Sequence, residues 1–474
     1  LMAGTKFPVF IPYTGKEVGF VRAADDKELD AAINGAAKAQ LDWARTPLKE
    51  RAEILFRVRS ELLARLPEIS QRVSLESGKL IAEAEAGLRK GIEVLEFAIS
   101  LENLERGGRV EVSRGVFCEE RREALGVVAG ITPFNFPAMV PMWMIPIAIA
   151  LGNSFIWKPS EKTPLTSILI AEAFAKAGLP AGVLSIVHGG RGLAEKICDH
   201  PGISAVGFVG SSPAARAVYA RAAQAGKRAL ALGGAKNHIV LMPDADPEIA
   251  AQGILASFTG CAGQRCMAAS VLLLIDGSEK ILDEVVARAG KMRLGKDMGA
   301  IISRESLNRL EAALARAEST GAKIRIDGRT AQAKSGLDPT LSDGNWLGAS
   351  IIDEARADSE AACEELFGPL LTVVRCRNLS EALAIENRNP YGNACSVFTQ
   401  NGAVAEEVTR RSRVGMVGVN IGVPVPREPF SFGGIGMSKF GAGDITGPSA
   451  LNFWADLRKV TVKWQISGDQ NWMS

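Results

Sequence analysis

The chain has 474 residues, of which 47% are hydrophobic and 23% charged, so it is a globular protein large enough for two or three domains. Its net charge of +2 gives no electrostatic reason to expect a nucleic acid or a membrane surface as a partner. The seven cysteines are scattered without a CxxC pair, which indicates neither a disulfide framework nor a zinc site and fits a reducing cytoplasm. The apolar stretch 138–151 is too short and too interrupted by proline to span a bilayer, and the first residues show no signal-peptide pattern.

Residues 26–106 carry alanine, leucine, glutamate and arginine at helical spacing, which predicts long amphipathic helices. From about residue 124, short apolar runs alternate with helical segments, and this alternation predicts βαβ units. The expected parallel strands are 125–130, 154–157, 184–187, 205–209 and 239–242, with helices such as 166–177 and 213–225 between them. A second α/β unit is expected to begin in 250–290 and to include strands at 371–375, 396–399 and 415–419. Segments 109–119 and 457–464 alternate as exposed edge strands do, and such edges are usually paired with another subunit.

One cysteine, Cys266, is a candidate nucleophile in the small-residue stretch Gly-Gln-Arg-Cys-Met-Ala at 263–268. A thiolate is well suited to attack an aldehyde carbonyl and form a covalent intermediate. The adjacent Arg265 is expected to lower the pKa of this thiol through its positive charge. The alternative is a cysteine that packs as a small apolar side chain, so other segments must decide.

The second candidate is Asn135, in Ile-Thr-Pro-Phe-Asn-Phe-Pro at 131–137, directly after the predicted strand 125–130. Its amide can donate to an oxyanion that develops in a nearby pocket, although an isolated asparagine is more often a turn residue. Further motifs follow in order: Trp-Lys-Pro-Ser-Glu at 157–161, Gly-Phe-Val-Gly-Ser at 207–211, Leu-Gly-Gly at 232–234 and Glu-Glu-Leu-Phe-Gly-Pro at 364–369. With all of these motifs, the chain resembles the aldehyde dehydrogenase superfamily over nearly its whole length.

This resemblance implies an α/β fold with a Rossmann-like NAD-binding domain, an α/β catalytic domain and a β oligomerisation arm. The expected NAD-binding domain comprises residues 1–108 and 124–232, and the expected catalytic domain comprises 233–415. Residues 109–123 and 455–466 are expected to be the oligomerisation strands, and 416–454 a return segment that borders the active site. The resemblance also implies a cytoplasmic enzyme that acts on a small aldehyde as a homodimer or homotetramer.

The nucleotide site lacks the usual GxGxxG fingerprint. Instead, Gly-Phe-Val-Gly-Ser at 207–211 closes a predicted strand and opens a helix, whose free amides and dipole can hold a pyrophosphate. The resemblance implies that Lys158 and Glu161 hold the adenosine ribose and that the acidic Glu161 repels a 2′-phosphate, which favours NAD over NADP. The other cofactor-binding residues that it implies are Phe134, Gly210, Ser211, Glu365 and Phe367. The three histidines are scattered, and we expect no metal site.

The family mechanism implies that Cys266 adds to the aldehyde, that Asn135 and the backbone amide of Cys266 stabilise the oxyanion, and that hydride transfer leaves a thioester. Hydrolytic members carry a glutamate base in Leu-Glu-Leu-Gly-Gly, whereas this chain has Ala231 at that position. Without a base, attack by water loses roughly a hundredfold in rate or more. Together with Ala-Lys-Asn-His at 235–238, this resembles the CoA-acylating methylmalonate-semialdehyde (malonate-semialdehyde) dehydrogenases. Coenzyme A is therefore the expected acyl acceptor.

A substrate with a carboxylate requires a cationic donor beside the nucleophile, and Arg265 meets this need by its position. The branch uses a second arginine on an early helix, where this chain has Lys90, which keeps the charge but not the planar geometry. Arg427 lies on a loop that would border the mouth of the pocket, and the alternative is a surface pair with Glu428. These three residues are the predicted substrate-binding set.

Two other functions are compatible with the sequence. The first is a hydrolytic, NAD(P)-dependent dehydrogenase of another anionic aldehyde, in which Glu365 or a positioned water replaces the missing base and the product is the free acid. The second is a dinucleotide-binding protein that has lost turnover, but the presence of both Asn135 and Cys266 argues against it.

Overall fold

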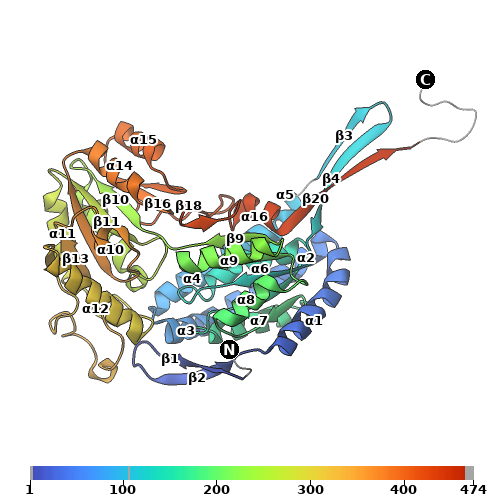
Figure 1. Cartoon of the computed structure of the whole chain (residues 1–474), viewed down its shortest axis with the longest axis horizontal. Coiled ribbons are helices and arrows are strands. Elements are labelled where there is room, and N and C mark those ends of the chain that lie inside the picture. The colour runs from blue at the N-terminus through green and yellow to red at the C-terminus, as the bar shows by residue number, and fades with distance from the viewer. Residues whose placement is uncertain (1–3, 105–106, 465–474) are drawn as a thin grey trace, which may run out of the picture.

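The computed structural model describes residues 4–104 and 107–464 of the chain. Residues 1–3, 105–106 and 465–466, which belong to the predicted segments 1–108, 26–106 and 455–466, lie outside the described residues. Figure 1 shows two lobes, each a sheet covered by helices, and a narrow β arm that projects from one of them. This arrangement confirms the predicted α/β fold with two α/β units and a β arm.

Helices dominate the N-terminal part of the chain after a short hairpin of β1 (Lys6–Phe10) and β2 (Glu17–Arg22). They are α1 (Asp26–Arg45), α2 (Leu48–Ala64), α3 (Leu66–Ser77), α4 (Ile81–Ile99) and α5 (Leu101–Leu104). α1 begins with a capping box, in which Asp25 accepts from the Glu28 amide at 2.8 Å and Glu28 accepts from the Asp25 amide at 2.9 Å. The helical prediction for this region is thus confirmed in its described part.

The first lobe is built on a six-stranded sheet with the strand order β19-β9-β8-β5-β6-β7. Its strands are β5 (Val127–Ile131), β6 (Ser154–Lys158), β7 (Leu184–Ile186), β8 (Ala205–Val209), β9 (Arg228–Leu232) and β19 (Lys439–Phe440). All neighbours are parallel except β19, which runs antiparallel to β9. The chain builds outward from β5 to β7 and then crosses to β8, so the strand order reverses between β5 and β8. Ligands of open α/β sheets bind outside the carboxyl ends of the strands at such a reversal.

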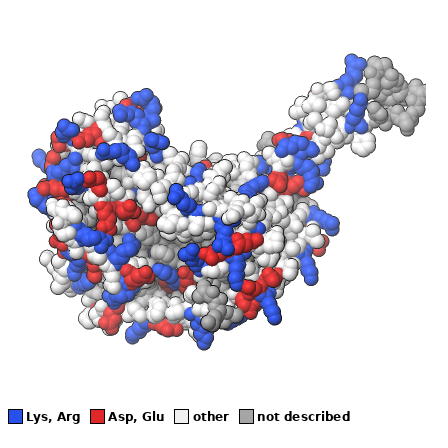
Figure 2. All heavy atoms as spheres, in the orientation of Figure 1, with Lys and Arg blue, Asp and Glu red and all other residues white. Residues whose placement is uncertain are grey.

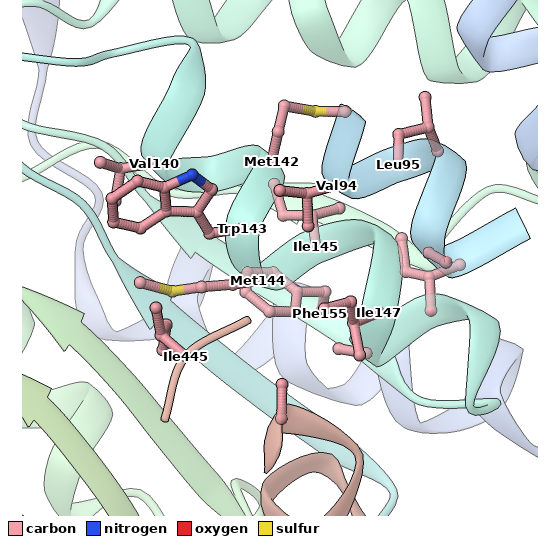
Figure 3. Packing of buried hydrophobic residues seen from close by; sticks show 14 of the residues in the cluster. Val94, Leu95, Val140, Met142, Trp143, Met144, Ile145, Ile147, Phe155 and Ile445 are labelled. Atoms are coloured by element: carbon pink, nitrogen blue, oxygen red, sulfur yellow. The ribbon is translucent and has the colours of Figure 1, made fainter. Parts of the chain in front are cut away.

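The core of this lobe lies on both faces of the sheet. One face is covered by α1, α8 (Arg191–Asp199) and α9 (Ser212–Gln224), and the other by α2, α4, α6 (Met139–Ala150), α7 (Leu165–Lys176) and α16 (Gly447–Trp454). Figure 3 shows Met142 and Ile145 of α6 on the side of Val94 and Leu95 of α4, and Ile147 of α6 beside Phe155 of β6. The apolar α6 is therefore a core helix, and in the described part of the chain no helix has the length and hydropathy needed to cross a membrane.

The second lobe contains a seven-stranded sheet with the order β12-β13-β14-β11-β10-β16-β17. Its strands are β10 (Asn237–Leu241), β11 (Ala269–Ile275), β12 (Lys323–Ile326), β13 (Ser350–Asp353), β14 (Leu370–Cys376), β16 (Ala394–Phe398) and β17 (Met416–Val419). The helices of this lobe are α10 (Pro247–Thr259), α11 (Glu279–Ala289), α12 (Arg304–Ser319), α13 (Glu360–Cys363), α14 (Leu379–Arg388) and α15 (Gly402–Arg411). The strand that we expected at 239–242 belongs to this sheet, as β10, and not to the sheet of the preceding strands. β15 (Tyr391–Gly392) and β18 (Ile435–Gly436) form a separate two-stranded antiparallel sheet.

The arm is a three-stranded antiparallel sheet of β20 (Ala455–Lys463), β4 (Val116–Ala124) and β3 (Gly108–Ser113), in that order. The expected single strand over 109–119 was wrong. The chain turns at Gly115, which has a φ of 72°, and forms the hairpin of β3 and β4 because glycine adopts this conformation without strain. β3 is an edge strand that is exposed along its whole length, and its Val110 and Val112 are 63% and 57% exposed.

Basic and acidic side chains are mixed on the surface, as their nearly equal numbers in the sequence suggest. Figure 2 shows basic and acidic side chains interspersed over the face in view, without a large area of one sign. Many are paired, such as Arg288 with Glu284 at 2.8 Å and Arg375 with Asp353 at 2.8 Å. This face therefore offers no extended charged surface to a polyanion.

Candidate active site

A large cleft lies between the two lobes, with a volume of about 1030 Å³. One wall comes from the segments that follow the carboxyl ends of β5, β6, β8 and β9, and the other from segments that precede β11 and β14. It is thus located at the reversal of strand order in the six-stranded sheet. The predicted catalytic and cofactor-binding residues all line this cleft: Phe134, Asn135, Lys158, Glu161, Gly210, Ser211, Cys266, Glu365 and Phe367. The structure brings them together, and their individual roles stay predictions.

The segment before Cys266 is a tight, left-handed turn. Cys261, Ala262 and Gly263 have φ values of 56°, 52° and 68°, so the chain reverses abruptly after α10. A Cβ on Gly263 would lie 2.0 Å from the carbonyl oxygen of Gly368, which leaves room only for glycine. The small residues of this stretch therefore serve the turn that presents Cys266 to the cleft.

Two asparagines that the sequence analysis did not select hold the backbone of Cys266. The side-chain amide of Asn237 donates to the carbonyl oxygens of Cys266 at 2.7 Å and Ala268 at 3.0 Å. Asn393 donates to the Cys266 carbonyl at 2.9 Å. Asn237 lies in the Ala-Lys-Asn-His stretch used for the resemblance, whereas the sequence around Asn393 carries no signal of its function.

The Cys266 thiol is half-buried, and its pKa is raised to about 12. Burial is the largest cause, and the negative charge of Glu365 adds to it, whereas the charges of Arg265 and Lys79 lower the pKa by less. Arg265 lowers the pKa of this thiol, as expected, but desolvation outweighs its charge and the net shift is upward. Ionisation of Cys266 requires a change in its surroundings, such as the arrival of a bound cation or loss of the Glu365 charge.

Asn135 is 7% exposed, and its side-chain amide donates to the carbonyl of Gln264 at 3.0 Å. It is therefore not a turn residue that bonds its own backbone, since its partner is 129 positions away. An amide nitrogen carries two N–H groups. One of them fixes Asn135 to the cysteine loop, and the second remains available to an oxygen atom bound beside Cys266.

The phosphate end of the cleft is formed by the first turn of α9. Ser211 is its N-cap residue, and within the described part of the chain the Ser211 side chain forms no capping hydrogen bond with the amides of this turn. Ser212 is turned away from the cleft, because its hydroxyl donates to the Met437 carbonyl at 2.8 Å and accepts from the Gly234 amide at 2.8 Å. Free amides at the positive end of a 13-residue helix fit a pyrophosphate.

Lys158 and Glu161 lie next to each other on the same side of the cleft. The Lys158 ammonium is 3.5 Å from the Glu161 carboxylate and donates to the Pro159 carbonyl at 2.8 Å. Burial lowers the pKa of Lys158, and Glu161 opposes this shift. The Glu161 side chain is 36% exposed and is free to accept from sugar hydroxyls.

Glu365 and Phe367 form the opposite wall. Glu365 accepts from the Ala235 amide at 2.9 Å, and burial raises the pKa of its carboxyl to about 7. Gly234 permits this approach, since a Cβ there would lie 2.1 Å from a Glu365 oxygen. Phe367 adopts a φ of 59° and packs edge-on against Phe134, with ring centres 5.9 Å apart. A glutamate that is half ionised near neutral pH thus lies in the same cleft as the cysteine.

The three predicted substrate-binding residues do not line the cleft. Arg265 donates to the carbonyls of Ala256 and Ser257 in the last turn of α10, the latter at 3.0 Å. The Gly260 position accommodates this guanidinium, because a Cβ there would lie 2.6 Å from it. The arginine is therefore held against a helix end in the free protein.

Lys90 and Arg427 belong to one ion-pair network, in which Lys90 is largely buried and Arg427 is exposed. Lys90 lies 2.7 Å from Glu428 and 3.0 Å from Glu93, and Arg427 lies 3.5 Å from Glu93. The alternative that pairs Arg427 with Glu428 was wrong, since Glu428 pairs with Lys90. Two cations and two carboxylates cancel, so this network offers no excess positive charge to a substrate.

The wall beside Cys266 and Asn135 is mainly apolar and includes Phe136, Val140 and Trp143. The basic residue on the opposite wall is Arg309, which the sequence analysis missed and whose charge acts on Glu365. Ala231 is fully buried in β9 and does not line the cleft. β9 therefore contributes no carboxylate to the site.

Comparison with known proteins agrees with this architecture. The profile described as "Aldehyde dehydrogenase family" matches residues 2–460. The chain is 38% identical to the malonate-semialdehyde dehydrogenase of Pseudomonas aeruginosa, with 97% of this chain and 94% of that protein covered. It is also 38% identical to the mitochondrial methylmalonate-semialdehyde/malonate-semialdehyde dehydrogenase [acylating] of Bos taurus, with 96% and 85% covered.

A crystal structure named as a putative methylmalonate-semialdehyde dehydrogenase from Sinorhizobium meliloti, complexed with NAD, superposes with a TM-score of 0.96 at 38% identity. The match covers 99% of this chain and 96% of that one. The full-length match of the profile, the similarity to these relatives and the arrangement of the cleft lead to one conclusion. The chain belongs to the aldehyde dehydrogenase family.

Proposed function

We propose that the protein oxidises a small anionic semialdehyde, of the malonate or methylmalonate type, with NAD and transfers the acyl group to coenzyme A. The single observation that carries this proposal is the combination of Cys266 and Asn135 in the cleft with a buried alanine, Ala231, at the base position of β9. The site has a nucleophile and an oxyanion donor, but no base from β9 to activate water. The names of the relatives support the same reaction.

The chain's own groups act in sequence. The Cys266 sulfur bonds to the aldehyde carbon, and the free N–H of Asn135 donates to the oxygen that becomes negative. NAD, when bound, supplies the acceptor for the hydride. The thiol of coenzyme A then bonds to the carbonyl carbon of the Cys266 thioester, and Cys266 leaves as a thiolate. A malonic semialdehyde also loses its carboxylate as carbon dioxide during turnover.

The first turn of α9, with Gly210 and Ser211, is proposed to hold the pyrophosphate, and Lys158 and Glu161 the adenosine ribose. Glu365, Phe367 and Phe134 are proposed to contact the nicotinamide ribose end. The choice of NAD over NADP rests on Glu161, whose carboxylate would lie beside a 2′-phosphate and repel it.

The domain bounds given above, and the pairing of the β arm with a second copy in a homodimer or homotetramer, are part of this proposal. The exposed β3 edge supports the second point, since an apolar free edge is a site for strand pairing. A cytoplasmic location is proposed because the described cysteines are all free thiols.

The reaction is tested by NADH formation from malonate semialdehyde and methylmalonate semialdehyde over many turnovers, with and without coenzyme A. We expect sustained NADH and an acyl-CoA product only with coenzyme A, and no NADH from the Cys266→Ala variant. A steady rate without coenzyme A, with the free acid as product, overturns the acyl transfer. That result would favour the hydrolytic alternative, for which Glu365 is the available base because its pKa is about 7.

Recognition of the substrate anion is proposed to use Arg265, Lys90 and Arg427. Their present partners are backbone carbonyls or carboxylates, so binding requires an exchange of partners. We expect Lys90→Met to raise KM for the anionic aldehyde about tenfold, with a smaller effect on propanal, which lacks the carboxylate. Equal effects on both aldehydes would exclude a role of Lys90 in anion recognition.

A further inference from the structure

A second cavity of about 430 Å³ lies in the catalytic lobe, and none of its lining residues lines the active cleft. Its walls come from β10, β11, α13, α14 and the segments that follow α14. The lining residues are His238, Val271, Ala357, Asp358, Ala362, Cys363, Ile385, Arg388, Asn389 and Pro390. Half of these are apolar. We refer to the buried His238 as the floor of this cavity and to the exposed Arg388 as its rim.

The polar group at the floor is His238. It is only 3% exposed, and its ring forms no hydrogen bond with any residue in the described ranges 4–104 and 107–464. Burial and the nearby Lys236 charge lower the pKa of His238 to about 3, so its ring is neutral and offers one donor and one acceptor. A buried imidazole without a partner that lines a cavity is an unused hydrogen-bonding group.

The polar group at the rim is Arg388, in the last turn of α14. Among the residues that the structure describes, its guanidinium has neither an ion pair nor a side-chain hydrogen bond. The acidic residue that lines the cavity, Asp358, is bonded to Arg356 at distances of 2.8 and 3.0 Å, and the charge of Arg388 acts on it without a direct ion pair in the described residues. Arg388 is therefore free to bind an anion that enters the cavity.

The second cavity and the active cleft share a wall of two chain segments. In the first, Cys363 lines the second cavity, and Glu365 and Phe367 line the cleft. In the second, Asn237 holds the Cys266 carbonyl and the next residue, His238, lines the second cavity. A ligand in the second cavity therefore acts on the same segments that position Cys266 and Glu365.

We propose that this cavity is a second binding site for a short hydroxy- or oxo-carboxylate, whose occupancy changes the reactivity of the active cleft. The carboxylate binds Arg388 at the rim, and the hydroxyl or carbonyl group bonds to His238 at the floor. The chain between them packs on Val271, Ala362 and Ile385. This site is independent of the acyl acceptor, since none of its residues takes part in the proposed reaction.

Binding is measured by calorimetry on the full-length Cys363→Ala enzyme after alkylation of Cys266 and with saturating NAD, so that the cleft is blocked and no reactive thiol lines the second cavity. The probes are 3-hydroxypropanoate, 4-hydroxybutanoate and 5-hydroxypentanoate. We expect at least one of them to bind with a stoichiometry of one per chain. Its counterpart without the hydroxyl should bind several times more weakly, because His238 then has no partner. No binding by any of the three overturns the proposal.

Arg388→Ala is the main variant, because Arg388 is exposed and its truncation leaves the core intact. We expect the affinity to fall about tenfold or more, as for loss of a charge-assisted hydrogen bond. The matched control is Arg377→Ala, an exposed arginine near the other end of α14 that pairs with Glu381, and it should bind as the parent does. Equal affinity of the Arg388→Ala variant would mean that the probe lies elsewhere and would overturn the site.

The coupling is measured on the unblocked enzyme as the rate at which iodoacetamide alkylates Cys266. We expect the bound probe to change this rate about fivefold or more, and the change to disappear in Arg388→Ala. Binding without any change of rate would overturn the effect on the active cleft. Neither readout depends on turnover, so failure of this inference is distinguishable from failure of the proposed reaction.

Discussion

Replacement of Asn237 by alanine tests how the fold positions Cys266, the candidate nucleophile. Asn237 is 3% exposed and forms three hydrogen bonds with backbone groups: it donates to the carbonyls of Cys266 and Ala268 and accepts from the Ala394 amide at 3.0 Å. It thus joins the start of β10 to the cysteine loop and to β16. Truncation removes all three bonds at once.

The Cys266 carbonyl keeps a donor in the variant, because Asn393 also bonds to it. The Ala268 carbonyl and the Ala394 amide lose the partner that Asn237 provides. Each buried backbone group that loses its hydrogen bond costs about 1.5 kcal/mol. The free energy needed to open β16 locally should therefore fall by about 3 kcal/mol, which increases the equilibrium constant of opening roughly 150-fold.

Cys395 reports this opening, since it follows Ala394 in β16 and is fully buried. Iodoacetamide reaches it only after the strand opens, and mass spectrometry gives its alkylation rate. We expect Asn237→Ala to accelerate this rate roughly 150-fold, and Asn387→Ala, a surface asparagine that also bonds two backbone groups, to accelerate it less than about tenfold. Similar rates in the two variants would refute the assignment of Asn237 as the residue that joins these three segments.

Three further predictions concern charge and space. Glu365→Gln should lower the pKa of Cys266 and accelerate its alkylation at pH 8 by about threefold or more, with the difference from the parent shrinking below pH 7, where Glu365 is protonated in the parent. Burial raises the pKa of Glu386 from 4.5 to about 7, so the free energy of unfolding of the parent should fall by about 3 kcal/mol as the pH rises from 4.5 to 7. The thermal midpoint of Glu386→Gln should fall less than that of the parent over this range. If the midpoints of the two proteins fall equally with pH, Glu386 is not the cause. Gly263→Ala should lower kcat/KM about a hundredfold or more, because its Cβ would lie 2.0 Å from a carbonyl oxygen. Gly321→Ala, which also has a positive φ but no atom within 4 Å, should retain full activity.

The sequence predicted the elements that have a strong periodic signal. Helices between 26 and 104 and strands such as β5 and β8 were found because their apolar residues recur at the spacing of their secondary structure. β9, β12 and β13 were not among the expected strands, and the hairpin of β3 and β4 was taken for one strand. The grouping of strands along the chain put β10 with the wrong sheet, although the expected bounds 233–415 included it in the catalytic domain, because a strand sequence shows burial but not the identity of its neighbours.

At the candidate site, too, some features could be predicted from the sequence and others could not. Motifs identified the residues that line the cleft, because those residues directly follow or precede strands of the two sheets. The sequence did not show that Asn237 and Asn393 both bond to the Cys266 carbonyl across separations of 29 and 127 positions. The sequence indicated the contribution of Arg265, which lowers the pKa of Cys266, but not the larger upward shift from desolvation, since neighbours along the chain are visible in a sequence and burial is not.

The sequence by itself therefore determined the family resemblance, the choice of Cys266 as candidate nucleophile and the absence of a glutamate at position 231. Only the tertiary structure decided which charges are free to act. Arg265 is adjacent to Cys266 in sequence but is held by the end of α10, and the Lys90 and Arg427 charges are cancelled by Glu428 and Glu93. The physical reason is that a charge acts through its distance to other charges and its exposure to water, and both are set when distant segments pack together.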